Sequence, residues 1–396
     1  METAVAQRKT GPVWLTARIV CVGLSVLLLM LPATLSHADH ADPPWWPIPV
    51  KSYYGTYNPV HKRLGQACTS LGRPKLEEWV PPRPAAKPYE VGVCIPHLKD
   101  PYWLAVNYGM ITEARRLGIG IRLLEAGGYD ELHTQIAQMR GLAASGVDGI
   151  LLGAVSYSDS DAVIAEITAQ GIPVVAVSND VSAPSVSAKA LVSFYEMGYF
   201  AGEFVVENAE KAALETVRIS FFPGPRNSGW APETLDGFMD AMEYFPGHVD
   251  VLDVSWGDTG KDVQRELLRK SVYRTGPVDY VVCNAVAAEA APDLFREMGL
   301  TRDSRIVSTY LMPSLYDKIV SGQVAAAPSD LSVFQGRMGV DMMVRILNGD
   351  TPGREFPFRS GPFIPMVTPG NISSYPYEGL FGPKDYKPEF SFRPGQ

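Results

Sequence analysis

The sequence predicts an α/β protein made of two Rossmann-like parallel-sheet lobes joined by a hinge. Short apolar runs alternate with helix-like segments from residue 89 onward, which is typical of βαβ units and a parallel sheet. The alternation starts again near residue 194 with a second set of similar size. Further helices and strands are predicted after residue 310, where the second set is already complete. They indicate that the chain crosses between the lobes more than once, and such crossovers form a hinge.

The first set contains four strands and three helices. Gly118, Gly146 and Gly171 directly follow the helices, as expected of residues that end a helix. The predicted strands span 89–96, 121–125, 149–152 and 173–178, and the predicted helices span 102–117, 130–145 and 160–170.

The second set repeats this order, beginning with a long helix. Its predicted helices span 194–214, 234–242, 262–273 and 287–298, and its predicted strands span 218–222, 249–255, 280–284 and 305–309. The surplus elements are a helix over 314–321, a strand over 324–328, a helix over 334–347 and a short strand over 363–367.

Composition excludes one class of partner. The 396 residues are 46% hydrophobic, which is enough to bury a substantial core in two or three lobes. The formal net charge is -8, whereas binding to nucleic acid needs a basic surface that neutralises phosphates. We therefore expect no nucleic-acid partner.

Residues 1–38 have the three-part pattern of a signal peptide. Arg8, Lys9 and Arg18 precede the apolar run 19–31, and small residues ending at Ala38 follow it. We expect cleavage after Ala38 and export, with the periplasm as the destination. The alternative is an uncleaved membrane anchor.

Residues 39–87 differ in composition from the rest of the chain. They are rich in proline, tryptophan and tyrosine, and prolines at this density disfavour regular helix and favour extended segments. We expect an N-terminal extension wrapped over the main body, whose tryptophans pack rather than bind.

The cysteines allow at most one disulfide in the exported chain. Cys21 lies in the predicted signal peptide, which leaves Cys68, Cys94 and Cys283. In an oxidising compartment Cys68 and Cys94 are the pair to test, and burial of each as an ordinary small apolar residue is the alternative. None of the cysteines has zinc-site spacing.

Enzyme chemistry has little support in the loops. The histidines are scattered, no serine lies in a Gly-x-Ser-x-Gly elbow, and the run 224–229 does not fit a dinucleotide fingerprint. A phosphate-binding loop with its lysine is also missing. We therefore expect a protein that is not an enzyme and that uses no metal or cofactor.

The predicted strand ends carry an unusual share of aromatic residues. Asp100, Tyr102 and Trp103 follow the first strand, at the corner where an open α/β sheet holds its ligands. Two aromatic faces beside a carboxylate are typical of a recess for a small cation. The other strand ends present Asn179, Asp180, Phe194, Tyr195, Arg226, Asn227, Ser228, Trp230, Asn284 and Tyr310. A single aromatic residue there usually packs, whereas several that converge from both lobes favour a binding site.

The order of these elements resembles the type I periplasmic binding proteins of the ribose-binding class over residues 88–370. Within that class, several runs are similar to a branch that binds trimethylamine N-oxide (TMAO) and works with a sensor histidine kinase. Those runs are 99–104, 107–110, 124–129, 197–199, 223–225 and 287–291.

The resemblance implies a division of the chain into lobes. The first lobe takes residues 88–193 and 310–327, the second takes 194–309 and 328–370, and 371–396 form a C-terminal tail.

The resemblance also implies a ligand. Sugar binders of this class usually carry an aspartate where this chain has Tyr310 and an arginine where it has Pro232, so a sugar is disfavoured. An aromatic box suits the methyl groups and cationic nitrogen of TMAO or a related small methylated amine, such as choline or glycine betaine. The residues implied as ligand-binding are Asp100, Tyr102, Trp103, Phe194 and Tyr310.

Two functions remain open on this resemblance. In the first, the protein binds TMAO between its lobes and signals to the periplasmic domain of a sensor histidine kinase. In the second, it is the substrate-binding receptor of an ABC importer for a small amine or sugar. A third, an enzyme acting on a small polar substrate, is disfavoured because no nucleophile and base pair is evident.

Overall fold

The computed structural model describes residues 47–59, 70–300 and 304–395. The predicted signal peptide and Cys68 lie outside these residues. Cys94 and Cys283 are buried free thiols, and burial raises the pKa of Cys94 to about 12. Among the helices described, none is both long enough and apolar enough to cross a membrane.

The first lobe is built on a nine-stranded sheet with the strand order β15-β4-β3-β5-β6-β7-β13-β1-β2. Its central strands are parallel and apolar, because helices cover both of its faces. These strands are β3 (Glu90–Ile95), β4 (Gly120–Glu125), β5 (Gly149–Leu152), β6 (Val174–Val177) and β7 (Ala188–Ala190). One face packs against α2 (Leu132–Ala144) and α3 (Asp161–Thr168), and the other packs against α1 (Pro101–Leu117) and α9 (Ser332–Leu347).

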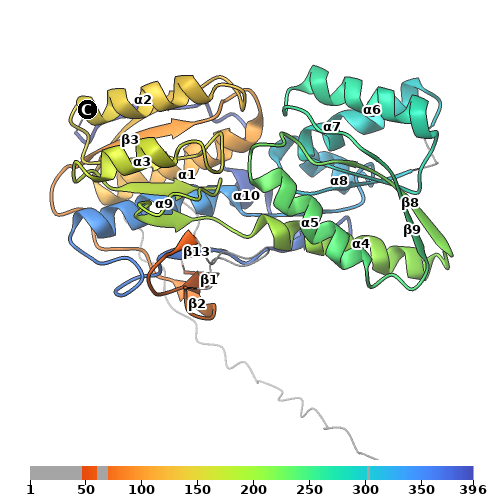
Figure 1. Ribbon diagram of the computed structural model, residues 1–396, viewed down its shortest axis with the longest axis horizontal. Coiled ribbons are helices and arrows are strands. Elements are labelled where there is room, and N and C mark those ends of the chain that lie inside the picture. Colours follow the sequence, from red (N-terminus) through yellow and green to blue (C-terminus); the bar gives the residue numbers. More distant parts are fainter. Residues whose placement is uncertain (1–46, 60–69, 301–303, 396) are drawn as a thin grey trace, which may run out of the picture. The chain divides into compact units, whose positions relative to one another are not determined.

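The second lobe is built on a four-stranded parallel sheet with the order β11-β10-β8-β9. Its strands are β8 (Thr216–Phe222), β9 (His248–Val254), β10 (Tyr280–Cys283) and β11 (Arg305–Ser308). One face packs against α4 (Phe194–Lys211) and α5 (Trp230–Met242), and the other packs against α6 (Lys261–Thr275) and α7 (Ala285–Glu297). The prediction of two parallel-sheet lobes is confirmed (Figure 1).

The chain crosses between the lobes after β7, after β12 (Ala327–Pro328), after β13 (Arg359–Pro362) and after β14 (Met366–Val367). The short helices η2 (Pro313–Leu315) and α8 (Tyr316–Val320) precede the second of these crossings.

The structure differs from the expected division of the chain. Residues 328–370 were expected in the second lobe, but α9 packs against α1, β5, β6 and β7, and β13 pairs with β7. Conversely, Ala325 and Ala326 of the segment expected in the first lobe bond to β11 of the second. The assignment depends on which sheet each element contacts, and the order of elements along the chain does not reveal this.

Both ends of the described chain add strands to the first sheet. The expected N-terminal extension contributes β1 (Ile48–Tyr53) and β2 (Lys75–Trp79), and β1 pairs antiparallel with β13. The expected C-terminal tail contains η3 (Ile372–Ser374), α10 (Tyr377–Phe381) and β15 (Ser391–Phe392), which pairs with β4.

Two helix pairs pack backbone against backbone at glycines. In the α1/α9 pair, a Cβ atom on Gly109 would lie 2.0 Å from the carbonyl oxygen of Val333. In the α4/α5 pair, a Cβ atom on Gly198 would lie 1.9 Å from the carbonyl oxygen of Thr234, and one on Gly237 equally close to that of Tyr195. Each pair therefore has a single close crossing that larger residues would force apart.

Replacement of Gly109 by alanine should destabilise the protein strongly. The new methyl group meets a backbone oxygen that cannot rotate away, so we expect a loss of roughly 3 kcal/mol in the free energy of unfolding. Gly141, exposed in the last turn of α2, provides the matched control, because a Cβ atom there would have no other atom within 4 Å. Gly141→Ala should gain about 1 kcal/mol from helix propensity. Urea unfolding of both variants checks the prediction, and equal stability of the two would contradict it.

Candidate ligand-binding site

A small cavity lies between residues of the two lobes, with about 330 Å³ of space that is partly open to solvent. All five residues predicted to bind a ligand line it, together with four that were not predicted as ligand-binding. Its lining residues are Asp100, Tyr102, Trp103, Tyr129, Asn179, Phe194, Trp230, Thr259 and Tyr310. Each follows the carboxyl end of a strand or begins the next helix, where a parallel sheet holds its ligands.

The residues missed by the sequence prediction carried signals of different strength. Asn179 and Trp230 were recognised as strand-end residues but not assigned to the site. Tyr129 lies at the end of the run 124–129, which was noted only as part of the family resemblance. Thr259 had no signal in the sequence.

Six aromatic side chains form most of the cavity wall. The ring centroids of Tyr102 lie 5.5 Å from Trp103 and 5.7 Å from Tyr310, both edge to face. Trp230 continues the chain of contacts at 5.7 Å from Tyr310, 6.1 Å from Phe194 and 6.2 Å from Tyr129. The rings therefore contact one another across the two lobes, and their spacing suits a ligand of only a few atoms.

Helix starts fix the positions of these rings. Asp100 caps α1 by accepting a hydrogen bond of 3.0 Å from the backbone N–H of Tyr102. Ser193 caps α4 in the same way, and Phe194 is its first residue. Trp230 is the first residue of α5. The positive ends of three helix dipoles thus border the cavity and favour negative charge in it.

Asp100 is the carboxylate of the cavity. It is 5% exposed, and burial raises its pKa to about 6 against the opposing effect of the backbone N–H groups of Tyr102 and Trp103. His97 lies 3.7 Å away, but burial lowers the pKa of this imidazole to about 4, so it is neutral near pH 7. Asp100 is therefore anionic at neutral pH without a cationic histidine beside it.

A second carboxylate orients Tyr102 from behind the cavity wall. The Tyr102 hydroxyl donates a hydrogen bond of 2.5 Å to Asp330, and the Gln335 amide donates to the same oxygen at 2.6 Å. Burial raises the pKa of Asp330 to about 6. Ser308 donates to the backbone oxygen of Tyr310 at 2.6 Å and fixes the loop that carries this ring.

The cavity also contains hydrogen-bond donors for a ligand oxygen. The Trp230 indole nitrogen is buried and forms no hydrogen bond of good geometry among the described residues, although it lies close enough to the Tyr129 hydroxyl to lower the pKa of that phenol. The Tyr129 hydroxyl accepts a hydrogen bond of 3.0 Å from Asn179, which leaves its own hydrogen to donate. A buried N–H group without an acceptor costs about 1 to 3 kcal/mol, so this nitrogen is suited to a ligand acceptor or a water.

Contacts between the lobes lie on two sides of the cavity. Lys99 and Asp258 form an ion pair of 2.7 Å, and Thr259 lies 3.3 Å from the ring nitrogen of His97. On the other side, the backbone N–H of Tyr157 donates to Asn227 at 3.4 Å. These contacts hold the lobes together around the aromatic wall.

No described group of three or more His, Cys, Asp or Glu side chains is arranged to hold a metal ion. The cavity combines a carboxylate, aromatic faces and hydrogen-bond donors, which suit the two opposite charges of a small zwitterion.

Comparison with known proteins identifies the family. The family model described as "Periplasmic binding protein domain" matches residues 91–351. The Escherichia coli K12 periplasmic protein TorT is 33% identical over 312 residues, which cover 79% of this chain and 87% of TorT.

Solved structures of relatives share the fold. An ABC transporter solute-binding protein from Bradyrhizobium sp. BTAi1, with bound Bis-Tris, is 37% identical with a TM-score of 0.71, and the match covers 87% of this chain and 98% of that one. TorT in complex with the TorS sensor domain is 31% identical with a TM-score of 0.67. The complex was solved without ligand, where the match covers 76% of this chain and 100% of that one. It was also solved in the presence of TMAO, where the match covers 76% of this chain and 99% of that one.

Members of the matched family are periplasmic proteins that bind or sense solutes and have no enzymatic activity. This agrees with the weak support for enzyme chemistry in the sequence. With a family match over residues 91–351 and the two-lobed fold, the chain belongs to the periplasmic binding protein family.

Proposed function

We propose that this protein is a periplasmic sensor that binds TMAO, or a closely related small methylated amine, and reports it to a TorS-type sensor histidine kinase. The observation that carries the proposal is the cavity itself, in which six aromatic side chains surround space beside a buried carboxylate and an unpartnered indole N–H.

The chemistry of TMAO matches both halves of this wall. Its methylated cationic nitrogen suits the aromatic faces and Asp100, and each cation–π contact contributes on the order of 0.5 to 2 kcal/mol as water is removed. Its oxygen carries the negative charge and needs donors, which Trp230 and Tyr129 supply. The helix starts around the cavity favour that oxygen as well. Choline lacks an anionic oxygen, so it can use the aromatic faces and Asp100 but not the hydrogen-bond donors.

The relatives favour a sensing role. TorT, at 33% identity over most of its length, has been solved in complex with the TorS sensor domain and in the presence of TMAO. A ligand shifts the equilibrium between the open and closed forms only by the difference in its affinity for the two forms. A kinase domain that binds the closed form more tightly shifts the same equilibrium further.

A transport receptor is the second candidate function. The 37% identical ABC transporter solute-binding protein holds Bis-Tris, which is itself a small amine. Genes for a permease and an ATPase beside this one would favour transport, whereas genes for a sensor kinase and a TMAO reductase would favour sensing.

Isothermal titration of TMAO into the purified chain should show saturable binding that Tyr310→Ala abolishes, because this ring joins the aromatic residues of the two lobes. Choline and ribose are the control ligands. The titration is repeated with the periplasmic domain of the sensor kinase present. No detectable TMAO binding in either titration, together with binding of ribose, would overturn the proposal.

Replacement of Trp230 by phenylalanine keeps an aromatic face but removes the N–H group. We expect TMAO affinity to fall about tenfold, since a hydrogen bond to a charged oxygen is lost, and any choline affinity to change much less. Trp256→Phe, outside the cavity, is the control variant. Equal losses for TMAO and choline would indicate that Trp230 contributes its ring face and not its donor.

Binding should weaken as the pH falls through about 6. Asp100 loses its negative charge as it is protonated, because its pKa is raised to about 6, and a neutral carboxyl no longer attracts the cationic nitrogen. Titrations at about pH 7.5 and pH 5.5 should differ several-fold for the native protein, and Asp100→Asn should show weak binding at both. A native affinity that does not change with pH would contradict the assigned role of Asp100.

A further inference from the structure

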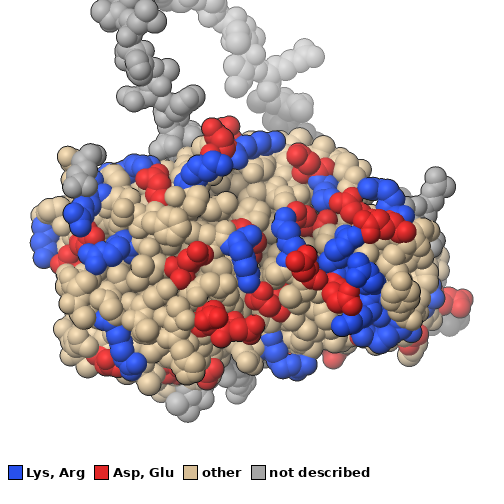
Figure 2. Space-filling view, turned by 90° about the horizontal axis from the view of Figure 1, so that it is seen from above, with Lys and Arg blue, Asp and Glu red and all other residues tan. Residues whose placement is uncertain are grey.

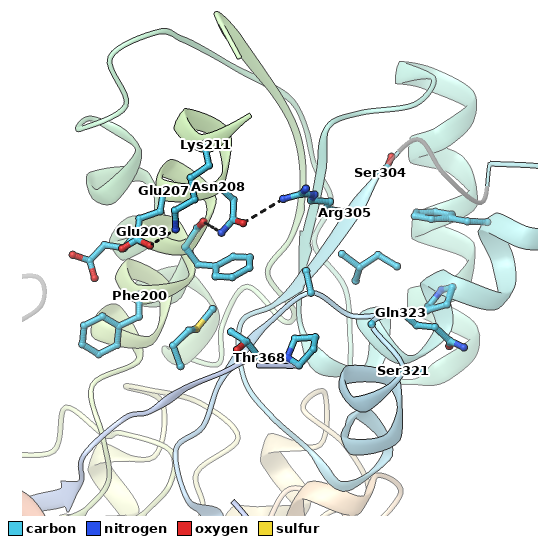
Figure 3. Close-up of a pocket in the computed structure, with 18 of the residues that line it drawn as sticks. Phe200, Glu203, Glu207, Asn208, Lys211, Ser304, Arg305, Ser321, Gln323 and Thr368 are labelled. Carbon is cyan, nitrogen blue, oxygen red and sulfur yellow. Dashed lines mark hydrogen bonds and ion pairs between the residues drawn. The ribbon is translucent and has the colours of Figure 1, made fainter. Parts of the chain in front are cut away.

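A broad groove lies on the second lobe, between α4 and the edge of its sheet. It encloses about 2090 Å³ of empty space open to solvent, compared with about 330 Å³ in the ligand cavity, and the two share no lining residue. About half of its lining is apolar, and the polar side chains Ser304, Ser321, Gln323 and Thr368 line it as well. Its apolar lining includes Phe200, Phe204, Phe295, Ile306, Ile364 and Met366. Figure 3 shows this α4 groove with the charged side chains of α4 on one side and Arg305 facing them.

The groove exists because the second sheet ends early on this side. β11 is the edge strand, and beyond it the described residues supply only Ala325, Ala326 and the two-residue strands β12 and β14. The backbones of Ala325 and Ala326 form hydrogen bonds with Ile306 and Ser308 of β11. At Arg305, the first residue of β11, no described residue pairs with this open edge of the strand. The first sheet, in contrast, is extended by β15, β1 and β2.

The rim of the groove carries charges in a defined order along α4. Glu203 comes first and has no cationic side chain within ion-pair distance among the described residues, while Glu207 pairs with Lys211 at 3.3 Å. Glu207 and Lys211 are 67% and 71% exposed, so this pair is weak and free to exchange partners. Arg305, opposite, donates to Asn208 at 3.3 Å. The groove is therefore negative towards the start of α4 and positive towards its end.

We propose that the α4 groove is the docking site for an amphipathic helix of the kinase sensor domain. This inference rests on the proposed sensing function. An apolar floor with a charged rim is the arrangement that binds a helix by its apolar face. The charge order selects a helix with Lys or Arg over Glu203 and Asp or Glu over Lys211 and Arg305.

The same helix connects the groove to the ligand. Phe194, the first residue of α4, lines the ligand cavity, and Phe200 lines the groove. Six residues of α-helix span about 9 Å, so the two positions are less than two turns apart. The glycine-packed crossing with α5 holds this part of α4 as one rigid piece. A change of α4 position on ligand binding therefore changes the groove directly.

Variants at the groove test the docking site without disturbing the core, because Glu203 is exposed and the half-buried Phe200 belongs to none of the described core clusters. Phe200→Asp removes an apolar floor residue, and Glu203→Lys reverses the charge at the negative end. Tyr273→Asp is the matched control, because this tyrosine is 77% exposed on α6, on the opposite face of the second sheet. Figure 2 shows the face that carries α6, where positive and negative side chains are interspersed. Charged residues of α6 form ion pairs, among them Lys261 with Glu289 and Arg274 with Asp253.

The measurement is the affinity of each purified variant for the periplasmic sensor domain of the TorS-type kinase from the same genome, with a TMAO titration beside it. We expect Phe200→Asp to weaken sensor binding at least about tenfold and Glu203→Lys several-fold, with Tyr273→Asp unchanged. TMAO affinity should stay within about twofold in all three.

The outcomes separate the inference from the function on which it rests. Sensor binding by the native chain that none of the variants weakens would overturn the groove and leave the sensing function intact. A native chain that binds TMAO but not the sensor domain would overturn the sensing function itself. Self-association of the native chain that Phe200→Asp abolishes would make a second copy the occupant instead.

Discussion

The packing of two helix pairs at glycines is the constraint on which the rest of the structure depends. α1 crosses α9 at Gly109, and α4 crosses α5 at Gly198 and Gly237, in each case with backbone atoms of one helix against those of the other. Three of these four helices begin at the ligand cavity and carry Tyr102, Trp103, Phe194 and Trp230 there. Because α4 and α5 cannot separate without losing these contacts, Phe194 and Trp230 at their starts are held at a fixed spacing. Within each lobe, the position of the aromatic side chains therefore depends on small residues that do not line the cavity.

The cavity places opposite electrostatic preferences within a few ångströms. Helix starts and the Trp230 N–H favour negative charge, whereas Asp100 and the aromatic faces favour positive charge. A ligand with a single charge satisfies only one set and leaves the other desolvated and unpaired. The proposed selectivity for a zwitterion rests on this arrangement, and it does not need many contacts. The neutral state of His97, imposed by burial, keeps a competing cation away from Asp100.

The sequence predicted the centre of each sheet well and its edges poorly. Apolar runs such as 149–152 and 173–178 are unambiguous because both faces of a parallel sheet are covered. β15 could not be predicted, since its two residues pair with β4 from a segment far away in the chain. The lobe that receives α9 is decided by the fit of Gly109 and Gly336 between two backbones, which no periodicity shows. In the site, the strand-end rule brought Asp100, Phe194 and Tyr310 to one cavity. Thr259 was missed because it reaches the cavity from a loop without a motif.

One sheet is built from a continuous segment of the chain and the other from distant segments, and this difference affects how the protein folds. All four strands of the second sheet lie within residues 216–308, so that sheet can form from one continuous piece of chain. The first sheet needs β1 and β2 near the start, β13 after the second lobe, and β15 at residues 391–392. Contacts between such distant segments form slowly. As the chain is synthesised from its N-terminus, the second lobe is the part whose sheet can be completed first. The first sheet is completed only when β15 pairs with β4.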